Sequence, residues 1–111
     1  MNVRNKRVIH TDIIRDNMQA ICNSVPPQTH VLAVVKSDAY GHGMLQTAEA
    51  AIAGGAEMLA VATVDEGAKL RKGGIQKPIL VLGALSSAEV KKGVLNDLIQ
   101  TVCSCEMVRL C

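Results

Sequence analysis

The 111-residue sequence contains no phenylalanine and no tryptophan, and Tyr40 is its single tyrosine. Aromatic side chains normally supply much of the buried area in the core of a small domain. Hydrophobic residues nevertheless make up 49% of the chain, which is enough to build a core and excludes a disordered tail. The scarcity of aromatic residues therefore favours a part of a larger fold, whose aromatic residues lie elsewhere.

Strong charge and long apolar runs are also lacking. The net charge is +2, and no block of Lys or Arg exceeds two residues, so neither nucleic acid nor a membrane surface is indicated as a partner. No apolar run approaches the roughly 18 residues that span a bilayer. The first residues lack the apolar segment of a signal peptide. We therefore expect a soluble protein of the cytoplasm.

The four cysteines do not have the spacing of a common metal-binding motif. No pair has the spacing Cys-x-x-Cys, and the three histidines do not accompany the cysteines at zinc-finger intervals. Cys103 and Cys105 are separated by one residue, a spacing that can chelate a soft metal. Reduced thiols of a cytosolic protein explain the same pattern more simply, so we predict no metal site.

Hydrophobic periodicity predicts a helix followed by alternating strands and helices. Apolar residues at helical spacing indicate a helix over about residues 12–24, which the prolines at 26–27 terminate. Short apolar runs then start near residues 31, 58, 78 and 98 and predict strands. The first of these, residues 31–35, does not alternate and is typical of a strand buried on both faces.

Helix starts follow two of these strands. Residues 63–66 and 86–89 both have the pattern of a capping box, and a last helical stretch begins near residue 104. Repeated strand–helix units of this kind build a parallel sheet. The pattern alone leaves open whether the sheet is doubly wound or belongs to a barrel, which needs eight strands.

The residues that suggest chemistry follow the first predicted strand. Lys36 ends that apolar run, and residues 37–43 after it are rich in turn-forming residues. In parallel α/β folds, functional groups gather at the carboxyl ends of the strands. An amine that is desolvated there becomes a better nucleophile towards carbonyl groups. Position alone favours the simpler interpretation, a lysine that merely ends a strand and reaches solvent.

The same segment resembles the pyridoxal-phosphate lysine signature of the alanine racemase family. Residues 34–43 read Val-Val-Lys-Ser-Asp-Ala-Tyr-Gly-His-Gly, and only Ser37 departs from the family's Val-Val-Lys-Ala-(Asn/Asp)-Ala-Tyr-Gly-His-Gly. Residues 13–17 and 59–83 also resemble family segments in the same order, whereas residues 8–10 depart from the family's Glu-Ile-Asp. The resemblance implies an α/β fold, the N-terminal half of a (β/α)8 TIM-type barrel. Residues 1–111 would form part of its N-terminal barrel domain, without the remaining strands and the C-terminal β-domain.

The resemblance also implies roles for individual residues. Lys36 matches the lysine that holds pyridoxal 5'-phosphate as an internal aldimine and moves the α-proton on one face of the substrate, while the cofactor accepts electrons. Tyr40 matches the tyrosine that contacts the cofactor phosphate. Strand parity predicts that Val34 and Leu82 point inward, near the cofactor ring. His42 is interpreted as a structural residue that holds the loop.

The activity that the resemblance implies is alanine racemase, an isomerase that interconverts L-alanine and D-alanine and supplies D-alanine for the bacterial cell wall. A full-length form is expected to be a homodimer. The family's second catalytic base, a tyrosine of the partner subunit's C-terminal domain, lies beyond the matched region, so the 111-residue chain is expected to be inactive alone.

Two other interpretations stay open beside this one, and a third is not indicated. A racemase for serine or another small amino acid stays open, as does a non-catalytic fragment that binds pyridoxal phosphate. A dinucleotide-binding domain is not indicated, because the glycines at 41 and 43 are not followed by the third glycine of that fingerprint.

Overall fold

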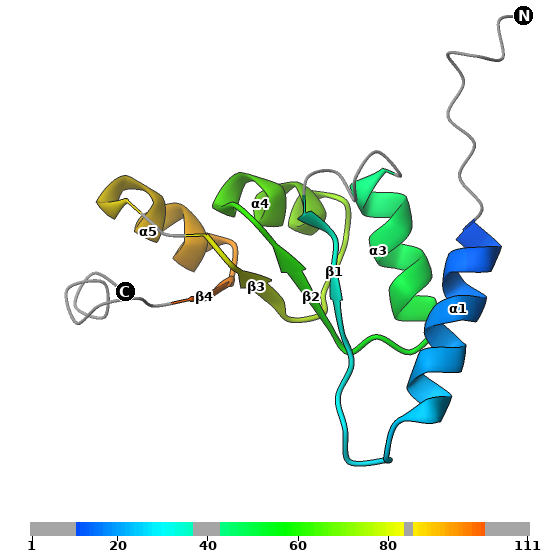
Figure 1. Cartoon of the computed structure of the whole chain (residues 1–111). Helices are drawn as coiled ribbons and strands as arrows, with labels where there is room; N and C mark the ends of the chain where they lie inside the picture. The colour runs from blue at the N-terminus through cyan, green and yellow to red at the C-terminus, as the bar shows by residue number, and fades with distance from the viewer. Residues whose placement is uncertain (1–10, 37–42, 84–85, 102–111) are drawn as a thin grey trace, which may run out of the picture.

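The computed structural model describes residues 11–36, 43–83 and 86–101. Within these ranges, helices and strands alternate along the chain after a first helix (Figure 1): α1 (Thr11–Ser24), β1 (Leu32–Val34), α3 (Met44–Ala53), β2 (Met58–Val61), α4 (Val64–Lys72), β3 (Ile79–Val81), α5 (Ser87–Leu95) and β4 (Ile99–Gln100). Each element lies where the hydrophobic pattern predicts it. The helical stretch expected after residue 104 lies outside the described residues.

The strands form one parallel sheet in the order β1-β2-β3-β4. The register aligns Val34 with Ala60 and Ala60 with Leu80, and Ile99 continues this row on β4. Every strand therefore pairs with the next strand along the chain, across a helical connection. A doubly wound sheet reverses its strand order, whereas a barrel does not. The order within the described residues is that of a barrel.

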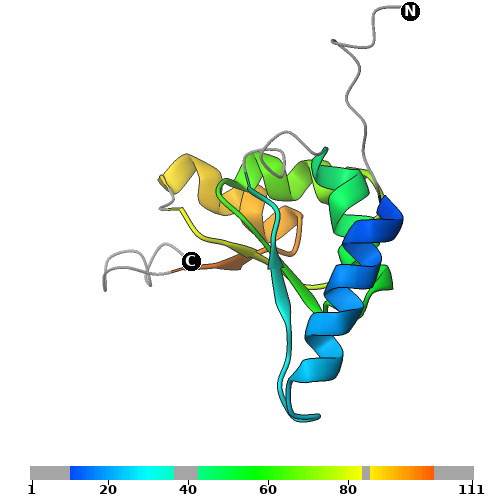
Figure 2. The ribbon, with the colours of Figure 1, turned by 45° about the vertical axis from the view of Figure 1, so that its right-hand side comes forward.

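The core lies between the sheet and its helices, which cover one face (Figures 1 and 2). The side chains that face the helices are apolar and buried: Ala33 and Val35 within and directly after β1, Leu59 and Val61 on β2, and Ile79 and Val81 on β3. Helical residues such as Ala48, Ala51 and Leu70 pack against them.

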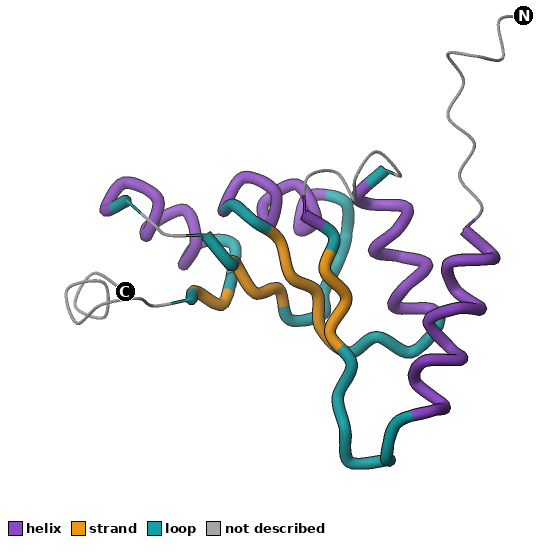
Figure 3. Tube along the Cα trace, viewed as in Figure 1, coloured by secondary structure: helices purple, strands orange, loops and turns teal. Residues whose placement is uncertain are grey.

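The opposite face of the sheet carries no helix among the described residues (Figure 3). Val34, Leu82 and Ile99 remain 48%, 40% and 44% exposed there. The prediction that the strand at 31–35 is buried on both faces is therefore wrong for Val34. The reason is that these residues supply a single layer of helices, while a barrel strand is covered on its second face by the strands across the barrel.

Both predicted capping boxes are centred on a glutamate. At the start of α4, the Thr63 hydroxyl accepts a hydrogen bond from the Glu66 amide at 3.1 Å, and the Glu66 carboxylate accepts one from the Thr63 amide at 3.2 Å. At the start of α5, the Glu89 carboxylate accepts from the amide and the hydroxyl of Ser86 at 3.1 and 3.0 Å. Each box satisfies amides that a helix start would otherwise leave unpaired.

Arg71 fixes the amino-terminal edge of the sheet. Its guanidinium group donates to four backbone carbonyls at 2.9 Å each, those of Ile75, Lys77, Asn96 and Asp97. Two of these carbonyls belong to the turn before β3 and two to the turn before β4. A single side chain on α4 therefore holds two connections in place, because only a planar fork of donors reaches so many acceptors at once.

We predict that Arg71→Lys destabilises the fold by about 1–3 kcal/mol, since a lysine keeps the charge but cannot bond all four carbonyls. Urea unfolding followed by circular dichroism measures the change. Lys72→Met, at the exposed neighbouring position, is the matched control and should change the midpoint little. An Arg71→Lys midpoint equal to that of the parent would contradict this role.

Helices α4 and α5 are also joined by an exposed ion pair between Asp65 and Lys92. The hydrogen bond and the charge of Lys92 hold the pKa of Asp65 below its ordinary value of 3.8. A carboxyl group with a lowered pKa stabilises the fold above its unfolded pKa, and this stabilisation is lost as the pH falls through the folded pKa.

We predict that Lys92→Met raises the pKa of Asp65, because the substitution removes both the hydrogen bond and the charge. An NMR titration of Asp65 measures the change. An unchanged pKa would show that the pair is not formed in solution.

Candidate functional site

Strand β1 brings Lys36 to the carboxyl edge of the sheet. The amide of Val35 donates to the carbonyl of Ala60 at 2.8 Å, so β1 stays paired with β2 up to the residue before Lys36. Val35 is buried beneath the helices, and Lys36 is half-buried. The backbone is therefore held in place up to the residue before the amine, whose side chain is half-buried at this edge.

The ends of the other strands lie along the same edge (Figure 1). Three amides continue the ladder past the strands: Leu82 donates to Val61 at 2.8 Å, Gly83 to Ala62 at 3.0 Å, and Thr101 to Val81 at 3.1 Å. All strands are parallel, so their carboxyl ends meet at one edge. This is the edge at which barrels of this kind place their functional groups.

The structure places Val34 and Leu82 on the helix-free face of the sheet, as strand parity predicts. Ala60 lies between Val34 and Leu80 in the register and is fully buried, because larger side chains flank its methyl group on both sides. Lys36, expected as the last residue of the strand, instead begins a helical turn after β1 ends at Val34, so strand alternation does not extend to its side chain. The site thus combines one amine with an apolar surface.

Two predicted residues of the site, Tyr40 and His42, lie outside the described residues. Contacts of Val34 and Leu82 with a cofactor ring stay a prediction.

Two polar side chains fix the strand ends in ways that the sequence did not predict. The Glu66 carboxylate accepts from the amide of Ala62 at 2.7 Å, in addition to its capping role, and so holds the end of β2. The Gln100 side-chain amide donates to the carbonyls of Gly83 and Thr101 at 2.7 and 2.8 Å. The capping box was a signal for Glu66, whereas no local pattern marks Gln100.

Gly83 is required where it stands by close approach of the backbone. A Cβ atom at this position would lie 2.4 Å from the carbonyl oxygen of Ala62. A side chain would therefore push apart the ends of β2 and β3, beside Leu82. The residue follows the strand end directly, so the displacement would reach the candidate site.

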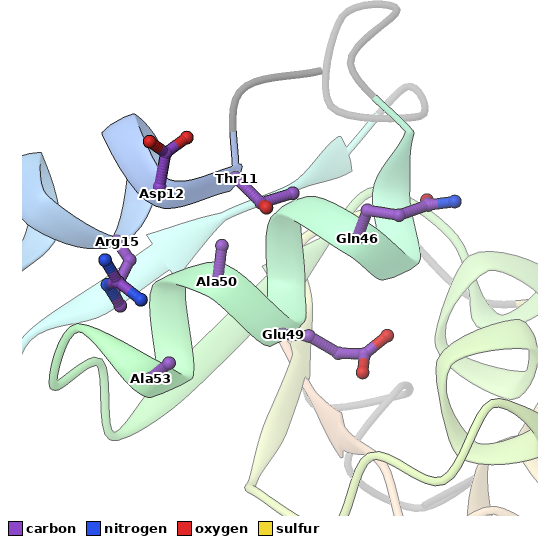
Figure 4. A pocket seen from close by; sticks show the side chains of 7 residues that line it. All are labelled: Thr11, Asp12, Arg15, Gln46, Glu49, Ala50 and Ala53. Atoms are coloured by element: carbon purple, nitrogen blue, oxygen red, sulfur yellow. The ribbon is translucent and has the colours of Figure 1, made fainter.

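A groove on the outer surface lies apart from the strand ends. Figure 4 shows it between α1 and α3, lined by Thr11, Asp12, Arg15, Gln46, Glu49, Ala50 and Ala53. All of these residues are helical, and Arg15 already forms an ion pair with Asp16 at 3.2 Å. The groove therefore brings together neither the lysine nor a strand end.

Metal-binding clusters and membrane spans are both missing from the described part of the chain. No cluster of three or more His, Cys, Asp or Glu residues there is placed to hold a metal ion. None of the helices described is both long and apolar enough to cross a membrane.

We predict that Gly83→Ala destabilises the fold by about 1–3 kcal/mol, because the new methyl group overlaps the Ala62 carbonyl. Gly93→Ala is the matched control, since its Cβ would meet the nearest atom, on Val64, at an ordinary 3.9 Å. Within helix α5 that control should stabilise the chain by about 0.5–1 kcal/mol. Denaturant unfolding of both variants tests the contrast, and a Gly83→Ala chain as stable as the parent would refute it.

Comparison with known proteins gives consistent matches. The family model described as "Alanine racemase, N-terminal domain" matches residues 9–111. The alanine racemase of Synechocystis sp. is 43% identical over 95 residues, which are 85% of this chain and 26% of the relative. The chain therefore spans about a quarter of the length of this relative.

Solved structures match at the level of the fold as well. The alanine racemase from E. faecalis superposes with a TM-score of 0.88 at 40% identity, covering 91% of this chain and 27% of that one. The enzyme from Bacillus anthracis with bound L-Ala-P gives a TM-score of 0.85 at 39% identity, covering 89% and 26%. The strands and helices described above are thus the N-terminal half of a TIM-type barrel, and the chain belongs to the alanine racemase family.

Proposed function

We propose that this chain carries the cofactor lysine of a racemase that interconverts L-alanine and D-alanine. The observation that carries the proposal is the position of Lys36, half-buried and two residues after the end of β1, at the edge where the described strands end. Identity of 43% to a relative named alanine racemase, over most of the chain, supports the reaction class. The complete activity is proposed for a polypeptide that joins these residues to the segments that the longer relatives contain.

We propose pyridoxal 5'-phosphate as the cofactor, because the residues present fit it. The Lys36 amine is the group that bonds covalently to an aldehyde. Val34 and Leu82 offer an apolar wall on the open face of the sheet, and the small Ala62 between their strands leaves room for a flat ring. When bound, this cofactor stabilises negative charge at the α-carbon of an amino acid. Tyr40 is proposed to bind its phosphate.

The chain's own residues would then position and move one proton. The Lys36 Nζ atom is proposed to remove or return the α-proton on one face of the substrate. Hydrogen bonds from Val35 and Leu82 to strand β2 hold both walls of the site at fixed places. Such rigid placement favours a reactive approach of the amine, and the apolar side chains exclude water from one side of the ring.

Alanine is proposed as the substrate in preference to serine or another small amino acid. The Bacillus anthracis relative was solved with bound L-Ala-P, an alanine derivative by its name, and it resembles this chain over 89% of its residues. The family resemblance supports a cytoplasmic homodimer for a full-length form. Residues 1–111 are proposed to belong to its N-terminal barrel domain.

The proposal is tested in a chimera in which residues 9–111 replace the matching segment of the E. faecalis enzyme. We predict an active racemase whose rate falls by at least about 10³-fold on Lys36→Ala, since both the covalent attachment and one proton transfer are lost. An assay coupled to D-amino-acid oxidase measures the rate. Lys72→Ala, on the exposed side of α4, is the control and should leave the rate unchanged.

Two outcomes would contradict the proposal. An active chimera that keeps its rate after Lys36→Ala would remove the lysine from the mechanism. A larger kcat/KM for serine than for alanine would contradict the proposed substrate.

A further inference from the structure

Gln100 is a polar residue in a row of the sheet that is otherwise apolar. The register aligns Gln100 with Val81, and Val81 with Val61. Both valines are buried beneath the helices. A polar group that leaves water costs free energy unless it finds hydrogen-bond partners. Gln100 is half-buried at the end of this row, so its side-chain amide needs partners that a valine would not need.

The Gln100 side chain reaches from β4 to the turn that follows β3. Its Nε2 atom donates to the carbonyl of Gly83 at 2.7 Å and to the carbonyl of Thr101 at 2.8 Å. The opposite orientation of the amide would place its oxygen against two carbonyl oxygens, so these acceptors fix which way the amide faces. Both donors are therefore used on the backbone, and the side chain is held in one position.

Gly83 is consequently held from both neighbouring strands. Its amide donates to the carbonyl of Ala62, after β2, at 3.0 Å, and its own carbonyl accepts from Gln100 on β4. A Cβ atom at this position would lie 2.4 Å from the Ala62 oxygen, which shows how closely the two backbones approach. The glycine thus links the ends of three strands.

Leu82 lies directly before this glycine and offers its side chain, 40% exposed, to the helix-free face of the sheet. The Leu82 amide donates to the carbonyl of Val61 at 2.8 Å. The backbone is therefore fixed on both sides of the Leu82 Cα atom, before it by Val61 and after it through Gly83. Gln100 supplies the part of the later support that comes from β4.

We propose that Gln100 is a positioning residue that acts through Gly83 to hold the Leu82 side chain against the ring of the bound cofactor. The inference rests on the proposed function, in which Leu82 forms one wall of the cofactor site. Gln100 does not touch the ring itself, because both its donors are used and it is aligned with the buried Val81. Its loss would let the wall move. Misplacement of reacting groups by about 1 Å can slow a reaction by roughly 100-fold.

Cofactor affinity tests the proposal in the chimera that carries residues 9–111. Titration of the cofactor-free chimera with pyridoxal phosphate, followed by absorbance, gives the dissociation constant. Gln100→Met keeps the length of the side chain and removes both donors, so we expect the dissociation constant to rise by about tenfold or more. Arg71→Lys is the matched control, because it also removes hydrogen bonds to backbone carbonyls but at the opposite edge of the sheet. It should leave cofactor affinity unchanged.

A double-mutant cycle separates positioning from a general loss of stability. If Gln100 acts through Leu82, the effect of Gln100→Met on the dissociation constant should fall below about twofold in a Leu82→Ala background, where the wall is already gone. A residue that merely stabilises the fold would weaken binding by the same factor in both backgrounds. That equality would overturn the proposal.

Hydrogen exchange supplies a measurement that needs no cofactor. In the 111-residue chain, Gln100→Met should speed exchange of the Leu82 and Gly83 amides by about tenfold, because these amides then open locally. The amide of Val35, which joins β1 to β2, is the internal control and should exchange at the rate of the parent. Equal acceleration of all three amides would indicate global destabilisation and contradict the proposal.

The remaining outcomes distinguish this inference from the proposed function. A chimera that loses its rate on Lys36→Ala but keeps its cofactor affinity on Gln100→Met would overturn the positioning role alone. A chimera that binds no pyridoxal phosphate would overturn both. Gln100→Glu, of nearly the same shape but without the two donors, is the second variant. If circular dichroism shows that both variants are unfolded, Gln100 serves the fold itself and the proposal fails.

Discussion

The rest of the structure depends on two rows of apolar side chains that cross the sheet beneath the helices, Ala33–Leu59–Ile79 and Val35–Val61–Val81. Their burial fixes the register of the strands, because a slip by one residue would expose a whole row and bury the opposite face. With the register fixed, the carboxyl ends of all strands stand in line. Because Val35 is packed beneath the helices, the next residue, Lys36, is held at this edge.

The same constraint separates stability from chemistry. One face of the sheet is closed by helices and holds the fold, while the other face and the carboxyl edge carry the lysine and its apolar surroundings. Polar side chains serve the edges: Arg71 holds the turns at the amino-terminal end, and Glu66 and Gln100 hold strand ends at the carboxyl edge. This division suits the proposed role of this part of the barrel, in which Lys36 would hold the cofactor.

Much of this arrangement was predictable from local patterns. Apolar runs and capping boxes located the strands and helices, and the residues around Lys36 were sufficient to indicate the family. The pattern could not choose between an open sheet and a barrel, because that choice depends on strand order. Arg71 and Gln100 were missed because their partners lie up to 26 residues away and leave no periodic signal. The prediction that Val34 is buried on both faces was wrong, because the described residues form only part of a barrel. The strands that would cover Val34 from across the barrel are not among them.

The most direct test of the central claim is to find which amine the cofactor selects. The 111-residue chain would be incubated with pyridoxal phosphate, reduced with borohydride and digested, and each lysine-containing peptide measured by mass spectrometry. The position of Lys36 just past β1, at the carboxyl edge of the sheet, predicts that the pyridoxyl group is found there, with little on exposed helical lysines such as Lys72 and Lys91. Labelling spread evenly over the exposed lysines, with none concentrated on Lys36, would contradict the account.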